Sequence, residues 1–306
     1  MTLRKVLPLA LLAVALTTAS GVWYRVHQTR AFFDQHALLS RFPAEEAAVV
    51  SVDVSLLRQA GLLGSSSALP PEAEYKQFLE GTGFDYKRDL DTLVGSFSDK
   101  GNFFIARGRF NWSRLREYAA RQGGSCYQDL CRLQGSTPDR HISFMPLRND
   151  ALALAVSTND LAVTLLTRPG QTITATLPAE PVWLSLPGSE LRKPNALPGG
   201  LRYVLSALQT ADRILFTVGL AGNPASAGIE ARLETTCRSA DDAKVLASQL
   251  RIATSTLKQA FAHDPQAQGD ELAALLTAGN FDQTDRKVFG KWPVKSNLLA
   301  LLTQGI

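Results

Sequence analysis

The chain has 306 residues and a net charge of +4, and 45% of its residues are hydrophobic while 20% are charged. This composition is typical of a globular chain rather than a disordered one, and the length allows one large or two ordinary domains. Lysine and arginine are spread along the sequence without a basic cluster or interleaved aromatic residues, which argues against a nucleic-acid-binding protein.

The N-terminus carries an apolar run from Val6 to Tyr24, preceded by Arg4 and Lys5. Its length is close to the roughly 20 residues that a helix needs to cross a bilayer, and the basic pair holds the N-terminus in the cytoplasm. We therefore expect one membrane span in the inner membrane of a bacterium. The bulk of the chain is then periplasmic.

Two interpretations of this segment remain open. Small residues from Thr17 to Gly21 allow a signal peptide that is cleaved after Ala19. Trp23 and Tyr24, which follow them, suit the headgroup level of a membrane. The second pattern is typical of an uncleaved signal anchor, which is the interpretation that we favour.

Alternating β-branched stretches predict strands, and apolar residues at helical spacing predict helices. Ser55 and Asn111 are placed to cap the helices that follow them. In the first half of the exported region the expected elements are a juxtamembrane helix 28–39, strand 47–54, helices 56–63 and 72–81, strands 93–98 and 102–110, helix 112–122, three short strands (around the cysteines, 141–146 and 152–157) and helix 160–167.

The second half starts the same order again. Its expected elements are strand 181–186, helix 201–211, strands 213–220 and 228–237, the long helix 240–261, a further helix, a segment at 281–292 and an apolar last turn at 298–302. Both halves thus run strand, helix, strand, strand, helix, which is the βαββα part of a ferredoxin-like unit.

We therefore predict an α+β fold, in which an N-terminal transmembrane helix is followed by two ferredoxin-like (βαββα) halves with antiparallel sheets. The predicted boundaries are 1–40 for the signal anchor and juxtamembrane helix, 41–170 for the first half, and 178–306 for the second half with its C-terminal helices. A mixed α+β domain without internal symmetry is the alternative.

Three cysteines lie in the exported part, where disulfides persist. Cys126 and Cys131 are separated by four residues, which suits two sulfur atoms that face each other across the end of a β-hairpin. We predict a disulfide between them and a buried free thiol at Cys237. The spacing is not the C-x-x-C of redox or zinc sites.

The search for chemistry gives no catalytic residue, no cofactor and no metal. None of His27, His36, His141 and His263 has metal-ligand spacing to another. No nucleophile motif or phosphate-binding loop stands in a fitting context.

Asp85, Asp89 and Asp91 remain as enzymatic candidates, because paired carboxylates hydrolyse glycosidic bonds. Roles in a turn and in the first turn of a helix explain them more simply.

Four short sequences carry a resemblance: TGFD at 82–85, DLD at 89–91, the strand 103–110 with its G-x-F ending, and GKWPV at 290–294. With the apolar N-terminal run, they make the chain similar to a group of membrane-anchored bacterial envelope proteins of α+β type, to which no activity is assigned. The resemblance implies a location and a fold, since its motifs are turn and packing residues.

We expect a non-enzymatic, membrane-anchored envelope protein that acts in binding or assembly with a protein or envelope-polymer partner. The alternative is a hydrolase that acts on an envelope polymer through acidic residues.

Overall fold

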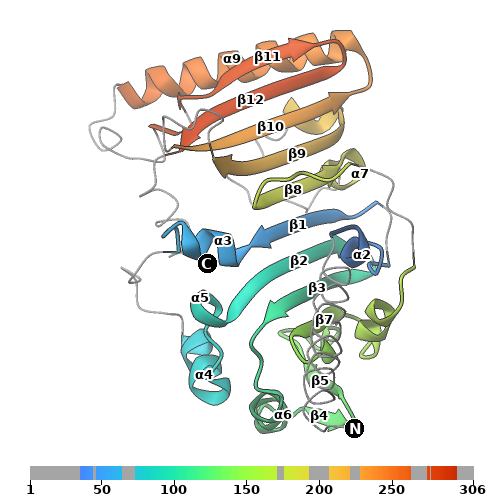
Figure 1. Ribbon diagram of the computed structural model, residues 1–306. Helices are drawn as coiled ribbons and strands as arrows, with labels where there is room; N and C mark the ends of the chain where they lie inside the picture. The colour runs from blue at the N-terminus through green and yellow to red at the C-terminus, as the bar shows by residue number, and fades with distance from the viewer. Residues whose placement is uncertain are drawn as a thin grey trace, which may run out of the picture.

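The fold is dominated by one large antiparallel sheet (Figure 1). The computed structural model describes residues 35–43, 46–63, 73–170, 176–192, 207–220, 228–262, 274–275 and 277–294. Within these residues, 12 strands lie in the spatial order β11-β12-β10-β9-β8-β1-β2-β3-β7-β6-β5-β4.

The strands cover most of the expected stretches. They are β1 (Ala48–Asp53), β2 (Leu90–Ser98), β3 (Gly101–Gly108), β4 (Ser125–Tyr127), β5 (Leu130–Gln134), β6 (His141–Arg148), β7 (Ala151–Ser157), β8 (Val182–Pro187), β9 (Ala211–Leu220), β10 (Ile229–Cys237), β11 (Asn280–Thr284) and β12 (Lys287–Val294).

The helices are mostly short. They are α2 (Gln35–Leu39), α3 (Val54–Gln59), α4 (Ala73–Thr82), α5 (Tyr86–Asp89), α6 (Trp112–Arg121), α7 (Gly188–Leu191) and the long α9 (Ala240–Ala262), with the 3-10 helices η1 (Ala162–Thr167) and η3 (Ala207–Thr210).

The prediction of an α+β fold with two ferredoxin-like (βαββα) halves is wrong, because the described residues form one large antiparallel sheet with few helices. The first strands of the two halves, β1 and β8, pair antiparallel with Val49 opposite Ser185 and Val52 opposite Val182, so one sheet runs through both halves. β1 also pairs directly with β2, and the two are antiparallel, whereas in the split βαβ of a ferredoxin-like unit the first two strands are parallel and another strand lies between them. Alternation along a segment predicts a strand, but it does not tell which strand lies next to it.

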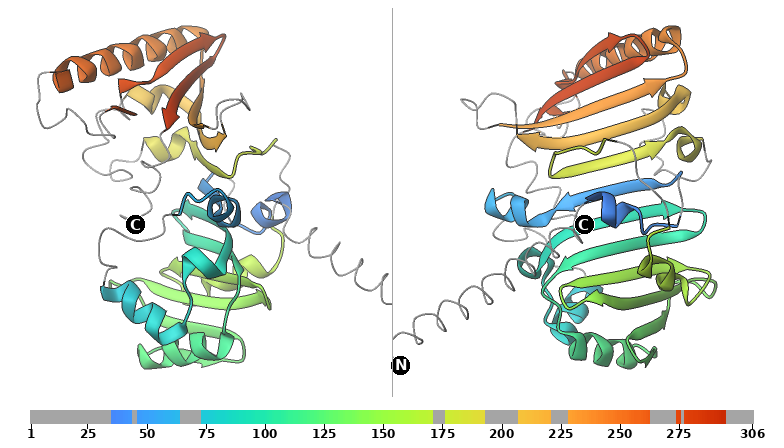
Figure 2. Two further views of the ribbon diagram at one scale, coloured as in Figure 1. Left: turned by 60° about the vertical axis from the view of Figure 1, so that its left-hand side comes forward. Right: turned by 45° about the vertical axis from the view of Figure 1, so that its right-hand side comes forward.

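The two halves do share an order of pairing. Strands β1 and β8 form the central pair. Next to β1 lie β2, β3 and then β7, and next to β8 lie β9, β10 and then β12. Helix α6 follows β3 and helix α9 follows β10, and both helices cover the same face of the sheet (Figure 2). The β4–β5 hairpin is an addition at the edge of the first half.

The opposite face is covered in the first half by α2 and η1. We call it the α2/η1 face, and the other the α6/α9 face. The hydrophobic cluster on the α2/η1 face consists of Leu38, Leu39, Phe42, Val94, Phe103, Ile105, Ala153, Ala155, Ala162, Val163, Leu166 and Trp183.

Along β10 in the second half, the same face is polar. Glu230, Arg232 and Glu234 of β10 point there, while the residues between them are buried on the α6/α9 face. Arg232 pairs with Glu180 at 3.4 Å, and Lys287 pairs with Glu234 at 2.5 Å. An antiparallel sheet tolerates one solvated face, so we interpret this charged surface as solvent-facing.

One of the two predicted helix caps is confirmed. The side chain of Asn111 accepts a hydrogen bond from the Arg114 amide at the start of α6. Helix α3 is capped by Asp53, which accepts from the Leu56 amide at 2.9 Å, and not by Ser55. The Ser55 hydroxyl instead donates to the Asp53 carboxylate at 2.7 Å.

Several predicted segments lie outside the described residues. They include the apolar run from Val6 to Tyr24, the helix at 28–39 except for α2, and the last turn at 298–302. Of the helix predicted at 201–211, only η3 is described, and Ala211 already belongs to β9. Among the helices of the described part, none combines the length and the apolar character that a bilayer crossing needs. The boundaries at 170 and 178 stay a prediction.

Candidate functional site

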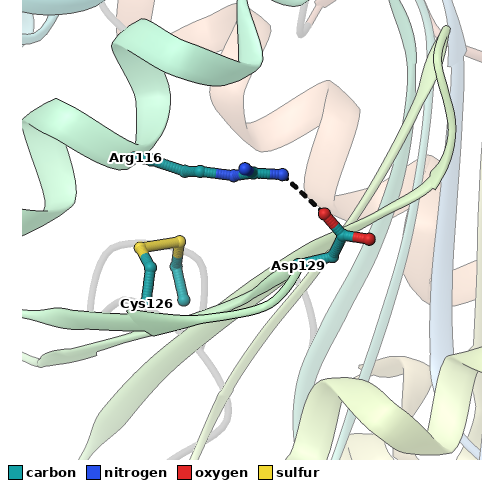
Figure 3. Close-up of a disulfide and its surroundings, with 4 residues drawn as sticks. Arg116, Cys126 and Asp129 are labelled. Atoms are coloured by element: carbon teal, nitrogen blue, oxygen red, sulfur yellow. Dashed lines mark hydrogen bonds and ion pairs between the residues drawn. A yellow bond between two sulfur atoms is a disulfide. The ribbon is translucent and has the colours of Figure 1, made fainter.

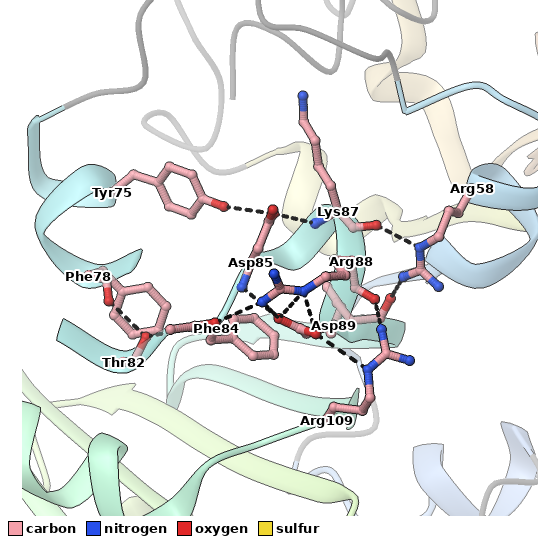
Figure 4. A network of polar contacts seen from close by, with 12 residues as sticks. Arg58, Tyr75, Phe78, Thr82, Phe84, Asp85, Lys87, Arg88, Asp89 and Arg109 are labelled. Atoms are coloured by element: carbon pink, nitrogen blue, oxygen red, sulfur yellow. Dashed lines mark hydrogen bonds and ion pairs between the residues drawn. The ribbon is translucent and has the colours of Figure 1, made fainter. Parts of the chain in front are cut away.

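The three candidate carboxylates lie at the turn that leads from α4 through α5 into β2 (Figure 4). Asp85 is the N-cap of α5, and its side chain accepts from the Lys87 amide at 2.9 Å. The Asp85 amide donates to the Asp89 carboxylate at 3.0 Å, so these two residues do meet. Asp91 is directed elsewhere, since its partner is Arg58 on α3, at 3.5 Å.

Asp89 is the centre of this network. Its side chain is 10% exposed and lies 2.7 Å from the Arg88 guanidinium and 3.3 Å from that of Arg109. Hydrogen bonds from Arg88 lower the pKa of Asp89 to about 2, helped by the Asp85 amide and by Arg109, while burial acts in the opposite direction. The carboxylate is therefore charged at neutral pH and its oxygen atoms are occupied by donors.

Two of the surrounding arginines also bind the backbone of the same turn. Arg58 donates to the carbonyl oxygens of Lys87, at 2.6 Å, and of Leu90. Arg109 donates to the carbonyl oxygen of Arg88. Guanidinium groups from α3 and from the segment after β3 thus fix both sides of α5, and this arrangement is typical of a structural clamp.

Tyr75 and Thr82 complete the cluster from α4. The Tyr75 hydroxyl donates to Asp85 at 3.3 Å, and burial together with the Asp85 charge raises the pKa of Tyr75 to about 12. The buried Thr82 hydroxyl donates to the Phe78 carbonyl at 2.7 Å and accepts from the Phe84 amide at 3.1 Å. Both side chains hold the turn after α4 in place.

The lowered pKa of Asp89 does not suit the general-acid role in a glycosidase. A general acid at neutral pH needs a raised carboxyl pKa, as in the glycosidases, and the pKa of Asp89 is lowered. The sequence did not predict Arg58 as the partner of Asp91 or Arg109 as a partner of Asp89. They lie 33 residues from Asp91 and 20 from Asp89, and no local pattern indicates such contacts.

The histidines are scattered. His36 is exposed on α2 and His141 opens β6, while His27 and His263 lie outside the described residues. Across the described ranges, no three side chains of the metal-binding types gather at one place.

The predicted disulfide is confirmed. Cys126 and Cys131 are paired residues of β4 and β5 and form a disulfide across the hairpin (Figure 3). The adjacent turn is joined to α6 by an exposed ion pair between Arg116 and Asp129 at 2.5 Å. Cys237 is a free buried cysteine, and burial raises the pKa of its thiol.

Comparisons with known proteins give a distant structural likeness. No family model and no curated protein matches the chain. Three crystal forms of the protein TP0453 match with 9%, 9% and 8% identity and TM-scores of 0.43, 0.48 and 0.43. The matches cover 87%, 88% and 87% of this chain and 96%, 98% and 96% of TP0453. A likeness this remote carries no argument about function.

Proposed function

We propose that the chain is a single-span, membrane-anchored envelope protein whose exported region acts in binding or assembly. The observation that carries the proposal is the apolar run from Val6 to Tyr24 after Arg4 and Lys5. Its length suits one bilayer crossing, and the basic pair favours a cytoplasmic N-terminus. The partner is a protein or an envelope polymer.

Two features of the exported region support this proposal. The disulfide between Cys126 and Cys131 is a bond that persists outside the reducing cytoplasm. The carboxylate of Asp89 is engaged by arginines that also fix the backbone of its turn, which favours a scaffold over a catalytic centre.

The topology is tested with an alkaline phosphatase fused after Ile306. We expect the fusion to be active, because this phosphatase needs an exported location, and a cytoplasmic reporter at the same position to be inactive. The control is the Arg4→Glu, Lys5→Glu variant, in which loss of the basic pair weakens the orientation signal. An inactive phosphatase with an active cytoplasmic reporter contradicts the proposal.

Measurement of the intact mass of the protein distinguishes an uncleaved signal anchor from a cleaved signal peptide. Protein extracted from membranes should keep all residues before Val22, because the anchor interpretation leaves the segment uncut. A mass that lacks the residues up to Ala19 shows that the signal is removed.

The absence of catalysis is tested on peptidoglycan and polysaccharide fragments. We expect no turnover by the purified chain. Turnover that disappears in Asp85→Asn, Asp89→Asn or Asp91→Asn, with folding intact, establishes the hydrolase instead.

A further inference from the structure

The outer surface of η1 exposes two leucines. Leu161 is 44% exposed and Leu165 is 50% exposed. The residues between and beside them, Ala162, Val163 and Leu166, are at most 2% exposed and fill the core on the α2/η1 face. Leu161 and Leu165 therefore do not pack η1 against the core, and their exposed side chains can contact another surface.

Helix η1 is joined directly to α2 and the turn after it. The Arg41 guanidinium donates to the carbonyl oxygens of Leu166, at 3.3 Å, and Thr167, at 3.0 Å. The Gly170 amide donates to the Ser40 carbonyl at 2.7 Å. Because Leu38, Leu39 and Phe42 share one hydrophobic cluster with η1, the two elements form one packed unit.

This unit stands close to the predicted membrane span in the sequence. Helix α2 begins at Gln35, and only residues 25–34 separate it from Tyr24. Ten residues reach at most about 36 Å when fully extended and about 15 Å when helical. A chain anchored through its apolar run therefore holds the start of α2, against which η1 packs, within about 36 Å of the bilayer surface.

We propose that the outer surface of η1, formed by Leu161, Thr164, Leu165 and Arg168, rests on the periplasmic surface of the phospholipid bilayer that holds the anchor. This inference rests on the proposed membrane anchoring and adds the orientation of the exported region. The leucines enter the boundary between headgroups and acyl chains, and the exposed Arg168 meets lipid phosphates.

A small contact is sufficient for such docking. The tether already holds η1 near the lipid, so that the contact forms within one molecule at a high effective concentration. Exposed aliphatic residues of similar kind, Val245 and Ile252, lie on α9, which covers the opposite face of the sheet. They supply a matched control.

The experiment places an environment-sensitive fluorophore on either face of the full-length chain. Thr164→Cys lies on the outer surface of η1, and Ser248→Cys is exposed on α9. Selective labelling is feasible because Cys126 and Cys131 are bonded to each other and Cys237 is buried. Each labelled protein is reconstituted into vesicles of phosphatidylethanolamine and phosphatidylglycerol that carry a lipid-linked quencher in both leaflets.

We expect the label at position 164 to shift to shorter wavelength and to lose emission to the quencher, while the label at position 248 keeps the emission of the protein in detergent. Leu161→Ser with Leu165→Ser should restore the emission at position 164. Val245→Ser with Ile252→Ser, which removes a matched pair of exposed aliphatic residues, should leave it quenched. Thermal unfolding of all variants checks that they stay folded.

Two negative results are distinguishable. A chain that floats with the vesicles but shows no quenching at position 164 overturns this inference and leaves the anchor intact. A chain that does not float overturns the anchoring proposal and this inference with it.

Discussion

Asp89 is charged although its side chain is only 10% exposed. The two guanidinium groups and the Asp85 amide stabilise the carboxylate more than burial destabilises it, so its pKa is lowered to about 2. A lowered pKa means that the folded state gains stability from this group above the pKa of the unfolded chain, near 4, and loses it as the pH falls toward 2.

We therefore expect Asp89→Asn to lower the free energy of unfolding by about 2 kcal/mol at pH 7, which corresponds to a shift of this size. The unmodified chain loses stability between about pH 4 and pH 2 as Asp89 is protonated, and the free energy of unfolding of the variant should fall less over this range. Denaturant unfolding at a series of pH values measures both effects.

Asp91→Asn is the matched control. Asp91 has a 31% exposed side chain and one ion pair at 3.5 Å, and pairs of this kind contribute about 1 kcal/mol or less. Equal losses in the two variants at pH 7 would contradict the role given to Asp89.

The sequence predicts only part of this cluster. The short spacing places Asp85 and Asp89 on one turn, and the structure joins them. The partners Arg58 and Arg109 come from α3 and from the segment after β3, and their approach depends on the pairing of β2 with β3 and on the packing of α3 against β2. Contacts that depend on tertiary structure leave no local signal.

At the scale of elements, local patterns predict the segments well. The strand expected at 228–237 is β10, and the helix expected at 240–261 is α9 (Ala240–Ala262). Alternation and helical spacing follow from which side chains are buried, so they are visible in the sequence. The junction of β1 with β8 has no such signal, because its partners are about 130 residues apart.

The β4–β5 hairpin permits a test of the disulfide. The bridge closes a loop with a sequence separation of only 5, so the loss of Cys126 and Cys131 to serine should lower the free energy of unfolding by at most about 2 kcal/mol. Thermal unfolding and far-ultraviolet circular dichroism should show a retained sheet. A chain that fails to fold without the bridge contradicts this assignment.

Thiol labelling supplies the control for that variant. Under denaturing, non-reducing conditions the unmodified chain should show one reactive cysteine, Cys237, because the other two are bonded. Three labelled cysteines would show that the bridge is absent in the isolated protein.

Trp183 on β8 fixes the junction between the halves. It is 2% exposed and lies opposite Ser51 of β1, in the cluster that contains Phe103. We expect Trp183→Ala to lower the free energy of unfolding by about 3–5 kcal/mol, because it leaves a large cavity.

Trp183→Phe is the matched variant. The indole nitrogen is buried without a hydrogen-bond partner among the described residues. This change therefore removes packing contacts but breaks no hydrogen bond of the indole. Its loss should be roughly 1–2 kcal/mol. Denaturant unfolding of both variants measures the difference. Equal losses of unfolding free energy in Trp183→Ala and Trp183→Phe would show that an aromatic ring at this position contributes little.

At the scale of the whole molecule, the hydrophobic clusters cross the boundary between the halves. Trp183 and Leu215 pack with first-half residues on the α2/η1 face. Leu62 of the first half packs with Ile229 and Ala231 of the second on the α6/α9 face. Each half separated from the other would expose apolar surface that is buried in the joined sheet.

The complete chain should therefore unfold in one cooperative transition. Calorimetry of the full-length protein in detergent should give a calorimetric enthalpy equal to the van't Hoff enthalpy, because β1 and β8 share one sheet and hydrophobic clusters on both faces contain residues of both halves. The predicted units 41–170 and 178–306, expressed separately, should show no cooperative transition. Two resolved transitions in the full chain, or a piece that unfolds cooperatively on its own, would show that the halves are independent domains that merely share an edge.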